Sequence, residues 1–337
     1  MLSSAKGTVI VTGANGGLGS AIVKQLASDP NLSSYYNIYT VRDATKVSES
    51  TSDSTHEFVS LDLTDLENVR EVAKVINARV SAGSIPPIRA LILNAGFQDF
   101  GQQTWTSQGL DTTFAANYLG HWLLTLLLLE SMDKANGRIV YLGSQSHDPH
   151  DPQNASGRAF VDPKYKTFIS DADSFHAIAK GTWSPATEDA GFRGGYRRYG
   201  ASKCFQVMMQ HELQARLDAD PALSKLCVAG VDPGAMATGM QRLAPWVIRV
   251  LLFQVVFPLI LYLSPGKAPI RPTSQPAGEV LEAARGGEPP KDMYFVEKRP
   301  KDTSEESRDA AKRALVWKET VKLAGLEESE TALTQWQ

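Results

Sequence analysis

Cysteine is scarce in this chain, which carries only Cys204 and Cys227 among its 337 residues. Two thiols cannot build a disulfide framework, so we expect a protein of a reducing compartment whose thiols are buried or inert. Histidine is also rare, with six residues, and no spacing of His and Cys matches a metal site. These shortages argue against a disulfide-stabilised secreted domain and against a metalloenzyme.

An excess of charge of one sign is missing as well. The 34 basic and 37 acidic residues leave a formal net charge of −3, which provides no electrostatic footprint for nucleic acid. Internal repeats are absent, and a core strand expected from Thr8 leaves no room for a removable signal peptide. We therefore expect a cytoplasmic protein that binds no nucleic acid.

Hydrophobic residues make up 42% of the chain, enough for a substantial core. Short aliphatic runs alternate with helical patterns. The expected strands span 8–11, 37–41, 58–61, 90–93, 139–142 and 228–231, and the expected helices begin at Ser20 and near Asp65, Gln108 and Tyr199. This alternation predicts an α/β fold, a Rossmann-type doubly wound parallel sheet that spans residues 1–337 as a single domain. Ligands should bind at the carboxyl ends of the strands.

A glycine-rich turn joins the first strand to the first helix. Gly13 permits the sharp turn, Gly17 lets the backbone approach a pyrophosphate, and Gly19 lets the helix pack on the strand. Helix N-terminal amides would then face the phosphates. Strand, turn and helix together predict a dinucleotide site. The turn residues assigned to it are Thr12, Gly13, Asn15, Gly16, Gly17, Leu18 and Gly19.

The next two strands end in residues that would select and hold the nucleotide. Arg42 stands where an acidic residue would bind the ribose diol of NAD, so it favours the 2′-phosphate of NADP unless it is a solvated surface residue. Asp43 follows directly and could counter it. Asp62 could accept from the adenine amino group or cap the next helix, and it is assigned to the cofactor site with Leu63. NADPH or NADP+ is therefore expected, with NADH less favoured.

Tyr199 and Lys203 are four residues apart, which on a helix places both side chains on one face. A phenol has a pKa of ~10, and a neighbouring ammonium moves that pKa toward neutral. The pair therefore predicts a proton-transfer group for a carbonyl or an alcohol.

Further motifs occur in a fixed order along the chain. They are Asn94-Ala95-Gly96, Asn117 on a helix, Gly143-Ser144 and Asp232-Pro233-Gly234. With the glycine turn and the Tyr199/Lys203 pair, this set resembles the short-chain dehydrogenase/reductase superfamily from about residue 7 to residue 240. Three segments resemble its branch of retinol dehydrogenases and light-dependent protochlorophyllide reductases: Asn117-Tyr-Leu-Gly-His121, Ser144-Gln-Ser-His147 and the tail around Met293-Tyr294-Phe295.

The resemblance implies a role for each catalytic residue. Tyr199 would be the general acid in reduction or the base in oxidation, while Lys203 would lower its pKa and contact the nicotinamide ribose. Ser144 would donate to the substrate oxygen, with Ser146 as a competitor. Asn117 would hold a water that links Lys203 to solvent. The implied cofactor contacts beyond the turn are Asn94, Ala95 and Gly96 near the adenosine, and Tyr199, Lys203, Pro233, Gly234 and Thr238 near the nicotinamide.

An insert at 145–198 is longer than the pattern needs and is rich in turn-forming and charged residues. We expect a surface excursion that borders the active-site mouth. Its arginines could attract an acidic substrate or the cofactor phosphates, but a solvated face is favoured, and its histidines are expected in loops. These residues are Arg193, Arg197 and Arg198, and His147, His150 and His176.

An apolar segment lies within 240–276, where residues 243–263 carry a single charge, Arg249. Its length would permit a membrane span, but an expected return strand at 293–296 argues against spanning. A substrate lid, a peripheral membrane contact and a homodimer surface remain as interpretations. The first two imply an apolar substrate. The last stretch, 303–337, is expected to be a charged helix and a frayed tail.

The combined prediction is an NADP(H)-dependent oxidoreductase. It would reduce a ketone or aldehyde of a bulky lipophilic small molecule, or oxidise the alcohol, with Tyr199 moving the proton. Two alternatives stay open: NADPH-dependent reduction of a C=C bond, and a non-catalytic NADPH-binding scaffold.

Overall fold

The computed structural model describes residues 5–47, 55–236, 243–244, 250, 255–263, 270–285 and 291–337. Within these residues, eight strands form one sheet in the order β3-β2-β1-β4-β5-β6-β7-β8. Neighbours pair in parallel from β3 to β7, and β8 is antiparallel, so the predicted parallel sheet is confirmed. The strands are β1 (Thr8–Thr12), β2 (Tyr36–Val41), β3 (His56–Ser60), β4 (Ile88–Leu93), β5 (Arg138–Leu142), β6 (Cys227–Asp232), β7 (Tyr294–Val296) and β8 (Arg299–Pro300).

Strand β1 shows why uninterrupted apolar runs form this sheet. All of its residues are buried. Ile10 faces one core and Val9 and Val11 face the other, because successive side chains point to opposite faces. The strand order turns back between β1 and β4, so the connections after these two strands diverge. Such a point leaves a crevice at the carboxyl edge of the sheet.

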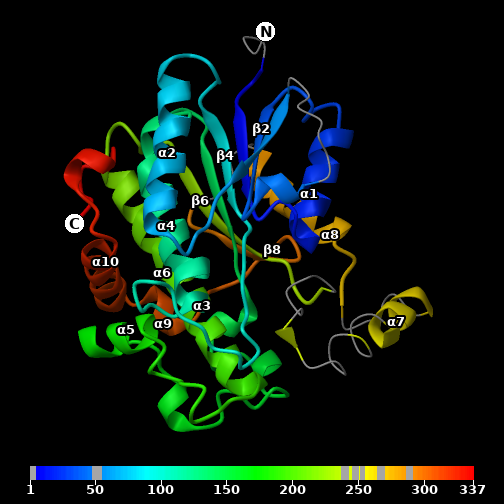
Figure 1. Ribbon diagram of the computed structural model, residues 1–337, viewed down its shortest axis with the longest axis vertical. Helices are drawn as coiled ribbons and strands as arrows, with labels where there is room; N and C mark the ends of the chain where they lie inside the picture. The colour runs from blue at the N-terminus through cyan, green and yellow to red at the C-terminus, as the bar shows by residue number, and fades with distance from the viewer. Residues whose placement is uncertain are drawn as a thin grey trace.

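Helices cover both faces of the sheet (Figure 1). The core on one face includes residues of α2, α4, α6 and α10, and the core on the other includes residues of α1 and α8. The helices are α1 (Gly17–Ser28), α2 (Leu66–Ser81), α3 (Thr112–Phe114), α4 (Gly120–Leu128), α5 (Ala172–Ala179), α6 (Phe192–Ala219), α7 (Phe257–Leu263), α8 (Ser274–Arg285), α9 (Glu305–Arg308) and α10 (Ala310–Ala324).

One described helical stretch, Thr112–Ser131, is long and apolar enough to cross a membrane by composition. It runs from α3 through a π-helical turn (Ala115–Leu119) into α4. Its apolar window is 89% buried inside the protein, as expected for a core helix.

The insert at 145–198 is packed into the protein, so the prediction of a surface excursion is wrong. It contains α5 and the first two turns of α6, a helix that starts seven residues before Tyr199. Phe175 of α5 is fully buried and stacks on Phe205 of α6, with ring centroids 5.7 Å apart. Because aromatic anchors hold this segment through turns and short helices, it shows no single hydrophobic period.

The C-terminal stretch is also packed. Trp317 of α10 meets Trp122 of α4 edge-to-face at 5.2 Å between centroids. The indole N–H of Trp317 donates to the Trp336 carbonyl, and Leu333 is 1% exposed. The predicted helix is present, but the prediction of a frayed tail is wrong because the tail covers that helix.

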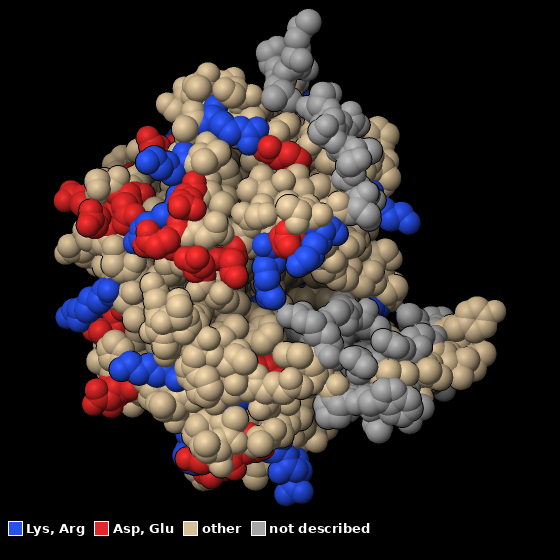
Figure 2. All heavy atoms as spheres, in the orientation of Figure 1, with Lys and Arg blue, Asp and Glu red and all other residues tan. Residues whose placement is uncertain are grey.

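Helix α7 is the described part of the apolar segment, most of which lies outside the described residues. It stands apart from the sheet in Figure 1 and is free of charged residues in Figure 2. Leu259, Tyr262 and Leu263 are 53%, 84% and 67% exposed. These three side chains are therefore not covered by the rest of the described protein, and the choice between lid, membrane contact and dimer surface stays a prediction.

Candidate active site

A cavity of about 480 Å³ lies at the carboxyl edge of the sheet, where the strand order reverses. Most residues assigned to the cofactor line it: Gly13, Asn15, Gly16, Gly17, Leu18, Gly19, Arg42, Asp62, Leu63, Asn94, Ala95, Gly96, Tyr199, Lys203 and Pro233. Thr12 and Gly234 are not among the lining residues, and Thr238 lies outside the described residues. Unpredicted lining residues are Thr40, Val41, Leu61, Thr64, Phe97, Ala116, Leu142, Gly143 and Met236. Most of them are next to a predicted residue in the sequence, so their positions could have been predicted from the ends of the strands.

The glycine turn has the geometry of a phosphate cradle. Gly13 adopts a φ of 65°, and a Cβ on Gly19 would lie 2.2 Å from the Gly13 carbonyl oxygen, so both positions require glycine. The Asn94 amide donates to the Thr12 and Gly13 carbonyls at 2.8 and 3.1 Å, which holds the turn against β4. The N-terminus of α1 therefore presents free amides to the cavity, a setting that suits the pyrophosphate of a dinucleotide.

Arg42 is exposed at the end of β2 and lines the cavity. Asp43 does not counter it: its Oδ1 accepts from the Thr45 amide and hydroxyl at 3.1 and 2.5 Å, and its Oδ2 lies 2.9 Å from Lys46 Nζ. These hydrogen bonds, from Thr45 foremost, lower the pKa of Asp43. At the end of β2, Arg42 is thus the charged residue that lines the cavity.

Asp62 does not cap the following helix. Asp65 is the N-cap of α2 and accepts from the Glu67 and Asn68 amides. Asp62 Oδ1 instead accepts from the Thr64 amide and hydroxyl at 2.9 and 2.7 Å while the residue lines the cavity. The structure therefore excludes the helix cap and places Asp62 at the cavity, while its contact with an adenine amino group stays a prediction.

Tyr199 and Lys203 lie together on α6, both buried, with Lys203 Nζ 5.5 Å from the Tyr199 ring centroid. The lysine donates to the Leu142 carbonyl and to Gln206 Oε1, each at 2.8 Å. Burial lowers the pKa of Lys203 to about 7, against the attraction of Asp232. This places the lysine's proton exchange near neutral pH.

Burial raises the pKa of Tyr199 well above its usual range, with smaller contributions from Tyr196 and Asp232 and an opposing hydrogen bond from Ser144. The expected lowering by Lys203 is therefore not what governs this phenol in the structure. Desolvation favours the neutral form. At neutral pH Tyr199 holds its proton, which is the state a proton donor needs.

Ser144 and Ser146 have different surroundings. Ser144 follows Gly143, which lines the cavity, and it is partly exposed, whereas Ser146 is fully buried. The Ser146 hydroxyl lies 3.0 Å from Ser144 Oγ, and the Ser146 amide donates to the same oxygen at 3.3 Å. The geometry therefore favours Ser144 as the hydroxyl that meets a substrate, with Ser146 supporting it.

His147 is a buried structural residue, contrary to the prediction of a loop histidine. Its Nδ1 lies 2.7 Å from the Ser144 carbonyl oxygen, and its Nε2 accepts from the Ser304 amide at 3.2 Å. These partners assign the proton to Nδ1. Burial also lowers the pKa of His147. The neutral ring ties the segment carrying Ser144 to the start of α9.

Asn117 lies in the π-helical turn, and its side chain clamps the loop after β4. Its Oδ1 accepts from the Phe97 amide at 2.7 Å, and its Nδ2 donates to the Phe97 carbonyl and to Ser202 Oγ, each at 2.9 Å. Both N–H groups of the side-chain amide are thus used within the protein, and the main-chain carbonyl of Asn117 lies 3.1 Å from His121 Nδ1. The water implied at this residue stays a prediction.

His121 and Gln206 join this region, and sequence reasoning assigned neither. His121 Nδ1 lies 3.1 Å from the Asn117 carbonyl, and its Nε2 lies 2.9 Å from Thr12 Oγ1. Burial lowers the pKa of His121 to about 3, so the ring is neutral. Gln206 accepts from Lys203. His121 follows Asn117 by four residues and Gln206 follows Lys203 by three, and these helical spacings could have identified both as neighbours of the predicted residues.

The chain is similar to known dehydrogenases and reductases. A family model described as short chain dehydrogenase matches residues 7–156. The short-chain dehydrogenase iccH of Talaromyces variabilis is 39% identical over 98% of this chain and 99% of its own. The chloroplastic protochlorophyllide reductase of Daucus carota is 26% identical over 95% of this chain and 79% of its own. The NADPH-bound carbonyl reductase from chicken fatty liver shares the fold, with a TM-score of 0.58 and 15% identity over 87% of this chain and 97% of that chain.

Proposed function

Because the chain belongs to the short-chain dehydrogenase/reductase family, in the branch of the retinol dehydrogenases and protochlorophyllide reductases, we propose that it reduces the carbonyl of a bulky lipophilic ketone or aldehyde with NADPH. One observation carries the proposal. Tyr199, Lys203 and Gly143, which directly precedes Ser144, line the same cavity as the glycine turn, and burial keeps the Tyr199 hydroxyl protonated at neutral pH.

Each side chain has a defined task in this reaction. The dinucleotide, held by the glycine turn, would supply the hydride to the carbonyl carbon. The Tyr199 hydroxyl donates its proton to the carbonyl oxygen, and the Ser144 hydroxyl donates a hydrogen bond to the same oxygen as negative charge develops there. Lys203, whose pKa is about 7 and whose Nζ lies 5.5 Å from the Tyr199 ring centroid, would then return a proton to the Tyr199 phenolate. Alcohol oxidation would run these steps in reverse.

The proposed preference for NADPH is supported by the end of β2. Arg42 faces the cavity, and Asp43 is engaged by Thr45 and Lys46. A guanidinium binds a phosphate through charge-assisted hydrogen bonds, which a ribose diol cannot match. Comparing kcat/KM for NADPH and NADH tests this, and a preference for NADH would contradict it.

Tyr199→Phe tests the proton transfer. The variant keeps the ring and loses the donor, so turnover of a lipophilic ketone should fall by about 10²- to 10⁴-fold. The assay is loss of NADPH absorbance, with circular dichroism and NADPH binding as controls for folding. Near-wild-type turnover would contradict the assigned role.

Reduction of a C=C bond is the second candidate, because the carrot relative is named a protochlorophyllide reductase. The same Tyr199 and Lys203 could serve it. Identifying the product by mass spectrometry and NMR distinguishes an alcohol from a saturated ketone. A non-catalytic scaffold would consume no NADPH with any substrate.

We also propose that the protein works in the cytoplasm with a peripheral membrane contact through α7. The exposed Leu259, Tyr262 and Leu263 support this contact. In a flotation assay, the wild type should rise with phospholipid vesicles, whereas the double variant Leu259→Ser/Leu263→Ser should stay in the unbound fraction. The alternative is a homodimer built on the same helix, and light scattering measures it. If the double variant becomes monomeric but still floats with the vesicles, the homodimer is favoured over the membrane contact.

A further inference from the structure

We propose that an aromatic row, defined as Phe100, Phe192, Tyr196 and Tyr199, binds the substrate beside the cavity that Tyr199 lines, and that it selects flat conjugated carbonyl compounds over saturated ones. This inference rests on the proposed function and specifies its substrate class. The carrying observation is a continuous series of ring contacts that ends at the proton donor.

Three members of the row share one face of α6. Phe192, Tyr196 and Tyr199 have the spacing i, i+4, i+7. The Phe192 and Tyr196 rings are stacked, 5.2 Å apart at 25°, and the Tyr196 and Tyr199 centroids lie 6.3 Å apart. Phe192 and Tyr196 are partly exposed and Tyr199 is buried, so the row descends from the surface to the reacting hydroxyl.

Phe100 extends the row from the loop after β4. Its ring lies 5.9 Å from that of Phe192. Its φ of 51° is left-handed, which is uncommon for a bulky residue and needs support from its surroundings. Phe97, in the same loop, lines the cavity beside Tyr199. The loop and α6 therefore each contribute an aromatic side chain to the lining of this cavity.

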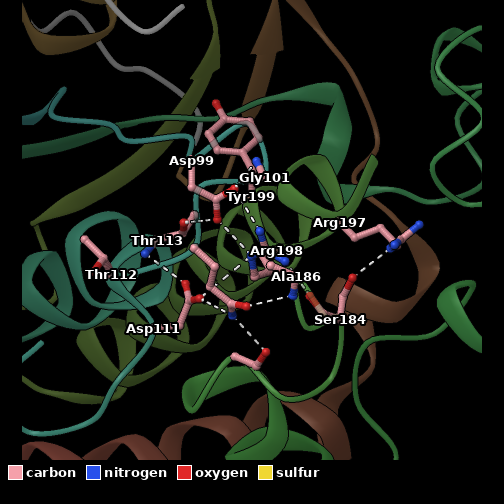
Figure 3. A network of polar contacts seen from close by, with 12 residues as sticks. Asp99, Gly101, Asp111, Thr112, Thr113, Ser184, Ala186, Arg197, Arg198 and Tyr199 are labelled. Atoms are coloured by element: carbon pink, nitrogen blue, oxygen red, sulfur yellow. Dashed lines mark hydrogen bonds and ion pairs between the residues drawn. The ribbon is translucent and has the colours of Figure 1, made fainter. Parts of the chain in front are cut away.

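A buried ion pair holds this loop on α6 (Figure 3). Arg198 Nε and Nη2 donate to the two carboxylate oxygens of Asp99, each at 2.8 Å, and neither side chain is more than 3% exposed. Asp99 Oδ1 also accepts from the Gly101 amide at 2.7 Å, across Phe100. A Cβ on Gly195 would lie 2.4 Å from that oxygen, so only glycine admits the carboxylate there. The pair thus fixes Phe100 against Phe192.

A second contact couples the row to the segment that carries Ser144. The Tyr196 hydroxyl donates to Asn154 Oδ1 at 2.8 Å. Asn154 Nδ2 donates to the Gln145 and Asp148 carbonyls at 3.1 and 2.7 Å. Gln145 directly follows Ser144. The row is therefore rigid before substrate arrives, which reduces the ordering that binding requires.

The chemistry of the row determines what it selects. Aromatic rings attract other π systems in offset-stacked or edge-to-face arrangements at centroid distances of about 4.5–7 Å. A flat conjugated ring could continue the row beside Tyr196 and place its carbonyl at the Tyr199 and Ser144 hydroxyls. A saturated ring of the same size is thicker and lacks the π face, so it would lose this contribution.

The test compares two bicyclic ketones, the aromatic 1-tetralone and the saturated 1-decalone, with the full-length protein and NADPH. The wild type should favour 1-tetralone in kcat/KM. Phe192→Leu and Tyr196→Leu should each lower that preference by about three- to tenfold, mainly through KM. Tyr196→Phe keeps the ring and should keep the preference. Phe58→Leu, in a ring pair with Tyr39 on β3 and β2, is the matched control and should change nothing.

Calorimetric Kd values of both ketones for the NADP+ complex provide a second readout. If both leucine variants bind and turn over the two ketones in the wild-type ratio, the aromatic row is core packing and the inference is overturned. If the wild type binds 1-tetralone preferentially, loses this in Phe192→Leu, but reduces no ketone, the inference stands and the proposed reaction is wrong.

Discussion

Arg198→Met is expected to destabilise the protein strongly, because Arg198 forms a buried ion pair with Asp99. Methionine retains much of the apolar length of arginine and removes the guanidinium. In the structure this guanidinium pairs with Asp99 through both carboxylate oxygens and lies 3.8 Å from Asp111 Oδ2. The two carboxylates are 1% and 2% exposed on their side chains, so water cannot replace the lost partner.

The remaining contacts show how large the effect should be. Asp99 would keep the Gly101 amide and the Thr113 hydroxyl, at 2.7 and 3.3 Å. Asp111, whose pKa burial already raises, would keep its Gln103 amide donor. Removing one partner of a buried ion pair costs about 3–5 kcal/mol, because the other charge stays desolvated. We expect Arg198→Met to lower the free energy of unfolding by that amount.

Urea unfolding at pH 7, followed by tryptophan fluorescence and circular dichroism, measures the change. Asp99→Leu/Arg198→Met is the matched comparison, since it removes both charges and should recover all but about 1–2 kcal/mol. A loss below about 1 kcal/mol in Arg198→Met would refute the reasoning. It would mean that the pair does not hold the loop carrying Phe100, and the rigid aromatic row would lose its support.

Three further predictions concern the cofactor and pH. Arg42→Ala should raise the KM for NADPH by about 10- to 100-fold and leave the KM for NADH unchanged, because one charge-assisted contact is lost; equal changes for both cofactors would contradict it. His121 has a folded pKa of about 3, below the unfolded value, so the unfolded state takes up the proton first as pH falls. Stability should therefore drop from pH 6.5 toward 3 by up to ~1.4 kcal/mol per unit, and His121→Asn should show a shallower drop in urea midpoints. Lys203 has a folded pKa of about 7, so the folded state releases its proton first as pH rises. Cofactor-free wild type should gain stability from pH 7 toward 10, and Lys203→Met, measured by thermal unfolding, should lack this gain.

Local patterns predicted the parts of the site that depend on neighbouring residues. The glycine turn needs no distant partner, because Gly13 and Gly19 are required by their own strand-turn-helix geometry. The spacing of Tyr199 and Lys203 places them on one helix face in any fold. Parallel strands end at one edge of a sheet, so residues after successive strands converge there, as the cavity shows.

The errors concern residues whose partners are far along the chain. Arg198 was predicted to be solvated, and its carboxylate partner is 99 residues away. His147 was predicted in a loop, and the amide that it accepts from lies 157 residues away. The sequence also did not indicate that the side chain of Asn117 binds the backbone of Phe97. Burial of such groups depends on which segments pack together in the tertiary structure, and the local hydrophobic pattern of the sequence does not contain this information.

The sequence alone thus determined the sheet, the phosphate turn and the proton-transfer pair, because each follows from short-range backbone geometry and alternating burial. Only the tertiary structure decided the state of Tyr199, whose proton is held by desolvation, and the buried pairing of Asp99 with Arg198. Both depend on the exclusion of water by segments distant in sequence, and the strength of electrostatic interactions follows from that exclusion.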